Sequence, residues 1–204
     1  MKIVAFGDSI TAAAQMQEDA RRWPALLQTA LRIRFPRIQT AVLNAGVGGN
    51  TSREGLARMD RDVIAQGPDC VLVEFGGNDA TPEPGRRVPL EEFAANLGEM
   101  KARIDALGHA RMVLLTFPPV IDRLHSLGLA AAFQESGGLD AFVERYREAT
   151  RDFAARHRLP LADIGRALRP RMEACILPDG VHLTAEGNRI VAEAVFDALA
   201  RIMG

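Results

Sequence analysis

The stretch Val4-Ala5-Phe6-Gly7-Asp8-Ser9-Ile10-Thr11, close to the start of the chain, decides the fold. It continues the apolar run Ile3 to Phe6, which predicts a short buried strand, and Gly7 ends that run. Ser9 follows where the strand would leave the sheet, and an open α/β sheet places its chemistry at that edge. Gly-Asp-Ser is also ordinary turn composition, so this motif alone leaves a plain turn and a catalytic serine both open.

Two further predicted strands end in segments rich in glycine and amides. Residues 40–43 lead into Asn44-Ala45-Gly46-Val47-Gly48-Gly49-Asn50-Thr51-Ser52, and the run Cys70 to Phe75 leads into Gly76-Gly77-Asn78-Asp79. Glycine at a strand exit indicates backbone that a ligand approaches closely, or backbone that needs positive φ. An amide directly after two glycines is placed like a hydrogen-bond donor over a cleft, although turns without a ligand have the same composition.

Predicted strands and helices alternate along the chain. Apolar runs predict two more strands at residues 112–117 and 159–164, and helical patterns cover residues 23–35, 52–66, 90–107, 140–157 and 184–203. We therefore expect one domain over residues 1–204, a three-layer α/β/α sandwich with a mainly parallel sheet in which Ser9, Gly49 and Asn78 share one rim. Residues 120–138 fit neither pattern, so a substrate-facing lid and a surface helix packed on the core both stay open.

The composition limits the partners. Lys and Arg number 25 against 26 Asp and Glu, and the net charge of −1 gives no electrostatic reason to expect nucleic acid or an anionic membrane as a partner. No apolar run is long enough for a signal-peptide core or a membrane span, which predicts a cytoplasmic protein without integral membrane association. In that compartment Cys70 and Cys175 are expected to be reduced thiols, with Cys70 in the core. The oligomeric state is not predicted.

A nucleophilic Ser9 needs a general base, because a free hydroxyl is barely ionised at neutral pH. Of the four histidines, His182 lies in Leu177-Pro178-Asp179-Gly180-Val181-His182-Leu183-Thr184, directly before the last predicted helix. A tight turn at Gly180 can bring the carboxylate of Asp179 against one imidazole nitrogen, which fixes the tautomer and favours the imidazolium. The alternative is a helix-entry turn that Thr184 caps.

Together the four stretches favour acyl transfer to water. In this hypothesis His182 deprotonates Ser9, Ser9 attacks an ester carbonyl, and a water activated by His182 clears the acyl-enzyme. The N–H groups of Ser9 and Gly49 and the side-chain amide of Asn78 hold the oxyanion. The predicted catalytic residues are therefore Ser9, Asp179 and His182, and the predicted oxyanion hole is Ser9, Gly49 and Asn78.

The four stretches, in this order, resemble the four sequence blocks of the GDSL (SGNH) hydrolase family. Gly7-Asp8-Ser9-Ile10 resembles the nucleophile block, Asn44 to Gly49 the second, Gly76-Gly77-Asn78-Asp79 the third and Asp179-Gly180-Val181-His182 the fourth. The resemblance implies a flavodoxin-like five-stranded sheet and hydrolysis of a small-molecule ester or thioester without a cofactor or a metal. It also implies Ser9 and His182 as the catalytic pair, with Asp179 in support.

The substrate stays open within that family, which includes arylesterases, thioesterases, lysophospholipases and carbohydrate O-acetylesterases. Residues 49–58 are similar to the bacterial thioesterase and lysophospholipase branch, whereas residues 120–138 match nothing recognisable. Substrate choice is expected in the loops around Gln15, Thr81 to Pro89 and Val120 to Gly138, because such loops surround the rim. Phe117 and Val120 are candidates for an acyl pocket, with a place in the core as the alternative.

Two alternatives lie outside serine catalysis. A metal-dependent phosphoesterase would use Asp8, Asp79, Asp179 and His182, but two-metal sites usually draw on more histidines than the one near this rim. A non-catalytic flavodoxin-like module could hold a small anion over the glycine loops. Such a module has no use for the pair Asp179 and His182.

Overall fold

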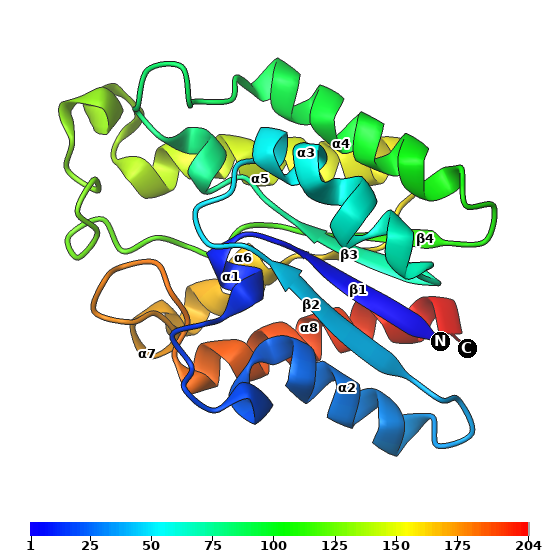
Figure 1. The fold of residues 1–204 in the computed structure, drawn as a ribbon. Helices are drawn as coiled ribbons and strands as arrows, with labels where there is room; N and C mark the ends of the chain where they lie inside the picture. The colour runs from blue at the N-terminus through cyan, green and yellow to red at the C-terminus, as the bar shows by residue number, and fades with distance from the viewer. Residues whose placement is uncertain (204) are drawn as a thin grey trace.

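A computed structural model describes residues 1–203, and its centre is a sheet of five strands (Figure 1). The strands are β1 (Lys2–Gly7), β2 (Ala41–Gly46), β3 (Cys70–Glu74), β4 (Arg111–Leu115) and β5 (Leu161–Ala162). Their order in the sheet is β2-β1-β3-β4-β5, and every neighbouring pair is parallel. The predicted five-stranded parallel sheet is therefore confirmed.

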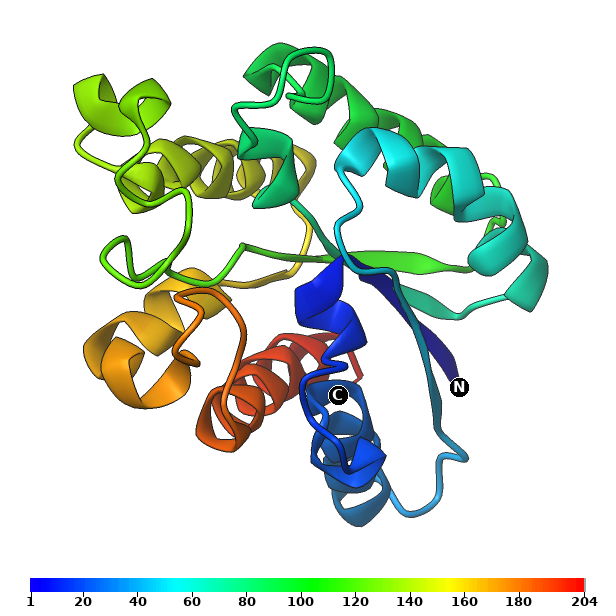
Figure 2. The ribbon, with the colours of Figure 1, turned by 60° about the vertical axis from the view of Figure 1, so that its left-hand side comes forward.

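Helices cover both faces of the sheet (Figures 1 and 2). One face carries α3 (Ser52–Asp62), α4 (Leu90–Asp105) and α5 (Leu139–His157), whereas α2 (Trp23–Arg34) and α8 (Ala185–Met203) pack together on the other. Because both faces are covered, the central strands are apolar over most of their length, and Ile3 to Phe6 of β1 are fully buried. The predicted three-layer sandwich is confirmed. Within residues 1–203, no helix combines the length and apolar character needed to cross a membrane.

Local sequence explains where two of the helices begin. Pro24 stands in the first turn of α2, where its missing N–H costs no hydrogen bond. Thr51 caps α3, because its hydroxyl accepts from the N–H of Glu54 while the Glu54 carboxylate accepts from the N–H of Thr51. This reciprocal cap holds the chain that leaves β2 at a fixed angle to the sheet.

Several predicted boundaries were wrong. The helix predicted over residues 52–66 stops at Asp62 and is followed by the 3₁₀ helix η2 (Ile64–Gln66). The strand predicted over residues 159–164 keeps only the two residues of β5, because the Asp163 carboxylate accepts from the N–H of Arg166 and starts α6 (Ile164–Leu168). The other short elements are α1 (Ser9–Ala12), η1 (Asp19–Arg21), η3 (Asn78–Ala80), η4 (Ala131–Ser136), η5 (Arg169–Arg171) and α7 (Met172–Cys175).

The carboxyl ends of the strands meet at one edge of the sheet, on the left in Figure 1. The unassigned segment 120–138 reaches this edge as turns followed by η4, and the side chain of Phe133 within it is buried. His109 precedes β4 and so lies toward the opposite edge. The segments that the sequence assigned to chemistry thus share the edge where a parallel sheet binds its ligands.

Candidate active site

The first strand delivers Ser9 to this edge. β1 ends at Gly7, and Ser9 is the first residue of the single-turn helix α1. The carboxylate of Asp8 caps α1 by accepting from the N–H of Ile10 at 2.9 Å, and the indole N–H of Trp23 donates to the Ile10 carbonyl at 3.0 Å. These contacts hold the backbone around Ser9, whose side chain lines a pocket.

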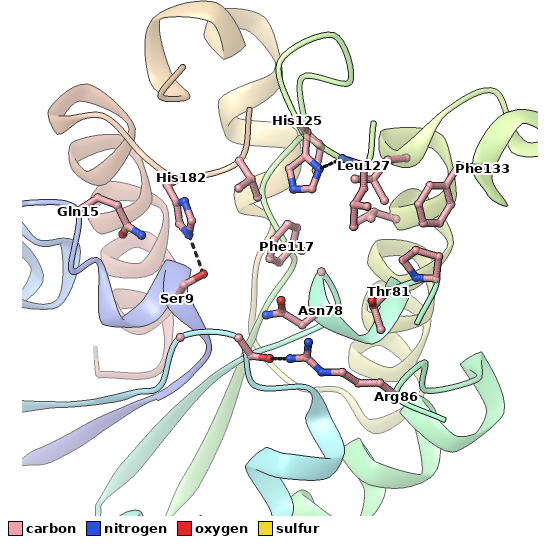
Figure 3. A pocket seen from close by; sticks show the side chains of 18 residues that line it. Ser9, Gln15, Asn78, Thr81, Arg86, Phe117, His125, Leu127, Phe133 and His182 are labelled. Atoms are coloured by element: carbon pink, nitrogen blue, oxygen red, sulfur yellow. Dashed lines mark hydrogen bonds between the residues drawn. The ribbon is translucent and has the colours of Figure 1, made fainter. Parts of the chain in front are cut away.

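His182 lies directly against this serine (Figure 3). Its Nε2 is 3.0 Å from the Ser9 Oγ, and its Nδ1 is 2.8 Å from Oδ2 of Asp179. The other carboxylate oxygen, Oδ1, accepts from the backbone N–H groups of Val181 and His182 at 3.0 and 2.9 Å. Burial by itself would raise the pKa of Asp179, but these hydrogen bonds outweigh it and hold that pKa below its usual value. Asp179 is therefore an anion that accepts from the imidazole.

The turn that joins Asp179 to His182 is built around Gly180. This glycine has φ +82°, and a Cβ there would fall 2.5 Å from the backbone nitrogen of His125 and 2.8 Å from the carbonyl oxygen of Ile121. The N–H of Ile121 in turn donates to the Gly180 carbonyl at 2.8 Å. The segment 120–138 therefore supports the turn that carries His182.

The predicted oxyanion donors line the same pocket. Asn78 is the first residue of η3, and its Nδ2 donates to Oδ2 of Asp8 at 2.9 Å and to the carbonyl of Asn50 at 3.2 Å. Figure 3 shows this amide nitrogen turned toward Ser9. Gly49 also lines the pocket, and the Arg86 guanidinium holds its peptide by donating to its carbonyl at 2.5 Å. The N–H groups of Ser9 and Gly49 and the Asn78 amide thus gather beside one hydroxyl, and both hydrogens of the amide NH₂ are engaged by the carboxylate of Asp8 and the carbonyl of Asn50.

Asp79, by contrast, does not line the pocket beside Ser9. It is buried, and its carboxylate accepts from the N–H of Ser52 at 3.0 and 3.1 Å and from the Ser52 hydroxyl, at the start of α3. Burial raises the pKa of Asp79 to about 6, against the lowering effect of those hydrogen bonds. Within residues 1–203, no three His, Cys, Asp or Glu side chains are grouped so as to hold a metal ion. The residues named for a two-metal phosphoesterase therefore do not form one site.

A cavity of about 470 Å³ adjoins Ser9 (Figure 3). Its apolar wall consists of Phe117, Val120, Leu127, Phe133, Leu139 and Val143. Its polar side chains, besides those of Ser9, Asn78 and His182, are Gln15, Thr81, Arg86 and His125. The three predicted specificity loops all reach this cavity, and the candidates Phe117 and Val120 both line it.

A model of the GDSL-like lipase/acylhydrolase family matches residues 5–190. The chain belongs to this family. One relative is YqeF of Bacillus subtilis, a lipoprotein described as uncharacterized. Its alignment with this chain spans 219 positions at 32% identity and covers 96% of this chain and 88% of that relative. An acetylxylan esterase of Geobacillus stearothermophilus is 26% identical, covering 95% of this chain and 91% of the relative. The crystal structure of LAE5, an α/β hydrolase from the metagenome of Lake Arreo, has a TM-score of 0.80 at 28% identity and covers 98% of this chain and 94% of that chain.

Membership in the GDSL family makes the protein a serine hydrolase of carboxylic esters, as the resemblance of its four motifs predicted. The predicted site residues Ser9, Gly49, Asn78, Asp179 and His182 are all brought together by the fold. None of the five lies at the far edge of the sheet. The structure therefore supplies the geometry from which their roles can be proposed.

His125 and Arg86 are cavity residues that the sequence patterns did not single out. Nδ1 of His125 accepts from the N–H of Leu127 at 3.1 Å, so the neutral imidazole carries its proton on Nε2. Burial lowers the pKa of His125, although the charge of Asp179 opposes that shift. His125 lies in a segment without periodicity, and Arg86 lies in a proline-containing loop. No local signal distinguishes either from an ordinary surface residue.

Proposed function

We propose that Ser9, His182 and Asp179 are the catalytic triad of this ester hydrolase. The observation that carries the proposal is the 3.0 Å contact between the Ser9 Oγ and the His182 Nε2. With Nδ1–H donating to Asp179, the neutral imidazole presents Nε2 as an acceptor. It takes the hydroxyl proton as Oγ attacks the ester carbonyl, and Asp179 stabilises the imidazolium that forms.

The oxyanion of the tetrahedral intermediate is held by the N–H groups of Ser9 and Gly49 and by Nδ2 of Asn78, which gives up its 3.2 Å contact with the Asn50 carbonyl to bind it. The N–H of Ser9 suits this role because the first N–H of a helix has no partner within it. His182 then gives its proton to the leaving alcohol, which departs and leaves the acyl group on Ser9. A water deprotonated by His182 attacks this acyl-enzyme, the bond between the acyl carbon and Oγ breaks, and His182 returns the proton to Oγ as the carboxylic acid is released.

The substrate we propose is a small carboxylic ester with one apolar group. A cavity of about 470 Å³ falls within the size range of small-molecule sites, and its wall of Phe117, Leu127 and Phe133 fits an aryl or alkyl group. An arylesterase-like activity therefore agrees best with the shape of the site, with thioesters of the same size as related substrates.

Deacetylation of carbohydrates is the second candidate. Gln15, Thr81 and His125 also line the cavity and could bind sugar hydroxyl groups. The likeness to an acetylxylan esterase supports the same candidate. An acetyl group is also small enough to leave most of the cavity to the alcohol.

We also propose that the protein is located in the cytoplasm, as the sequence predicts. The relative YqeF is called a lipoprotein, which describes that protein. Fractionation of the native host cells, followed by an assay of ester hydrolysis in each fraction, tests the prediction.

A panel of substrates separates the candidates. We expect nitrophenyl acetate, propionate and butyrate to be hydrolysed with kcat/KM rising up to about fourfold per methylene, because each buried methylene contributes roughly 0.8 kcal/mol. A preference above tenfold for acetylated xylose would favour the carbohydrate esterase, and one for an acyl-CoA would favour the thioesterase. Failure to hydrolyse any of these esters would contradict the proposed function.

Replacing Asn78 by alanine should lower kcat by roughly 10² to 10³, because one oxyanion donor is lost. KM should change little, since the interaction strengthens only as charge develops on the carbonyl oxygen. Asn96→Ala is a matched control: its Nδ2 donates to the Ser52 hydroxyl at 2.9 Å, and it does not line the pocket. Undiminished turnover of the Asn78→Ala enzyme would remove Asn78 from the mechanism.

A further inference from the structure

A buried glutamate lies beneath the nucleophile and has no part in the mechanism above. Glu74 is the last residue of β3 and pairs in register with Gly7 of β1. Its side chain is fully buried, Oε2 accepts from the hydroxyl of Thr11 at 3.0 Å, and Oε1 has no donor within residues 1–203. A carboxylate oxygen without a donor is costly in a dry interior. A carboxylic acid at the same place can itself donate.

The chain makes room for this carboxyl group at Gly7. A Cβ at Gly7 would fall 2.3 Å from the Thr11 Oγ1, 2.6 Å from the Glu74 carbonyl oxygen and 2.9 Å from the Glu74 Oε2. Any other residue at position 7 would displace the glutamate side chain or α1. The first glycine of the Gly-Asp-Ser motif thus admits a buried acid behind the catalytic serine.

The acid beside Glu74 is Asp8. Asp8 is fully buried, Oδ1 accepts from the N–H of Ile10, and Oδ2 accepts from Nδ2 of Asn78. Burial raises the pKa of Asp8 to about 7, and a hydrogen bond from Glu74 acts in the opposite direction. Burial, followed by the negative charge of Asp8, raises the pKa of Glu74 well above its usual value. Two neighbouring buried carboxyl groups do not both ionise readily, so one of them keeps a proton.

The place of that proton decides how Asn78 is oriented. An ionised carboxylate only accepts hydrogen bonds, so an ionised Asp8 holds the NH₂ end of the Asn78 amide. A protonated Asp8 could donate to the amide oxygen instead. The contact between Nδ2 and the Asn50 carbonyl would then be all that resists a flip of the amide, and a flipped amide presents its carbonyl where the oxyanion forms.

We propose that Glu74 is a neutral positioning residue whose proton keeps Asp8 ionised and thereby holds Asn78 as a donor to the oxyanion. The same carboxylate caps α1, so both the nucleophile and the oxyanion hole depend on one shared proton. The other charged groups near the pair are Asp79, whose charge opposes ionisation of Asp8, and the buried Arg58 of α3, whose Nη2 donates to the carbonyl of Gly7 at 2.8 Å. The inference rests on the proposed function, because it assumes that Asn78 binds the oxyanion.

Two substitutions at Glu74 test this inference on nitrophenyl butyrate. Glu74→Gln keeps a donor of the same shape without a charge, so its kcat should stay within about threefold of wild type. Glu74→Leu removes the donor at similar volume, and kcat at pH 7 should fall roughly 10- to 100-fold, less than the full loss of an oxyanion donor. Without its donor, the pKa of Asp8 rises further, so the acid limb of the pH profile should move to higher pH. Activity of the leucine variant should then recover in part at alkaline pH.

Each other outcome overturns the inference. A glutamine variant as impaired as the leucine variant would show that a carboxyl group is required at this position. A leucine variant with wild-type kcat and pH profile would show that Glu74 does not act on the site, and an equal loss at every pH would indicate packing alone.

If the leucine variant does not fold, infrared spectroscopy of the wild type and of Glu74→Gln tests the inference. The wild-type spectrum at pH 8 should contain a protonated carboxyl band that Glu74→Gln lacks, and its absence contradicts the inference. A wild-type enzyme without ester hydrolysis would instead contradict the proposed function.

Discussion

Ser9→Ala should lower kcat for nitrophenyl ester hydrolysis by about 10⁴-fold or more, the largest effect expected of any single substitution in this chain. The alanine leaves His182 and the oxyanion donors in place but removes the only hydroxyl within reach of Nε2 among the described contacts. Residual hydrolysis would come from water held near the oxyanion hole. The folded state should not suffer, because the caps of α1 involve Asp8 and Trp23 and leave the serine hydroxyl uninvolved.

Labelling with an organophosphonate ester makes the same test without substrate turnover. The wild-type enzyme should gain one phosphonyl group on Ser9, whereas Ser9→Ala should gain none. Ser136→Ala, in η4 and outside the pocket, is the matched control and should react like wild type. An active Ser9→Ala enzyme, or labelling at another residue, would exclude Ser9 as the nucleophile. Either result would leave the family assignment intact and the proposed triad wrong.

The sheet could be predicted because its central strands are covered on both faces. Such strands read as unbroken apolar runs, as in Cys70-Val71-Leu72-Val73, and each is followed by helical spacing. The edge strand β5 could not be predicted in the same way. Ile164, the residue after Asp163, is fully buried in α6 just as Ala162 is buried in β5, so the apolar pattern does not mark where the strand ends and the helix begins. That boundary is set by the Asp163 cap.

The proximity of the proposed triad and oxyanion groups could be predicted because a parallel sheet gathers its strand exits at one edge. Ser9 and Asn78 lie two and four residues after the ends of β1 and β3, so their proximity follows from topology. Glu74 shows what local sequence does not reveal. It reads as an ordinary end of a strand, and only the pairing with Gly7 brings its carboxyl group under α1. The place of His125 in the cavity likewise depends on a contact between distant loops, the hydrogen bond from the N–H of Ile121 to the Gly180 carbonyl.

Asp179→Asn should lower kcat by about 10⁴-fold while leaving the fold intact, because it forces the wrong tautomer on His182. In the wild type, Oδ1 of Asp179 accepts from the backbone N–H groups of Val181 and His182, and Oδ2 accepts from the imidazole. An asparagine must keep its oxygen on the two backbone donors, so its NH₂ group faces Nδ1. The imidazole then carries its proton on Nε2 and donates toward Ser9, where it has to accept.

The backbone of the turn fixes the orientation of the new amide, so the substitution changes the imidazole tautomer as well as removing a charge. A flipped amide would offer its oxygen to Nδ1–H and so permit the productive tautomer. It would also set NH₂ against the backbone N–H groups of Val181 and His182, so the turn holds the amide in the unproductive orientation. Nitrogen NMR of the His182 ring should show the proton on Nε2 in the variant and on Nδ1 in the wild type at alkaline pH. Asp197→Asn, at an exposed position of α8, is the control and should retain full activity. A variant that kept the Nδ1–H tautomer yet lost activity would show that Asp179 acts through its charge alone. A variant that kept both the Nδ1–H tautomer and full activity would exclude Asp179 from the triad.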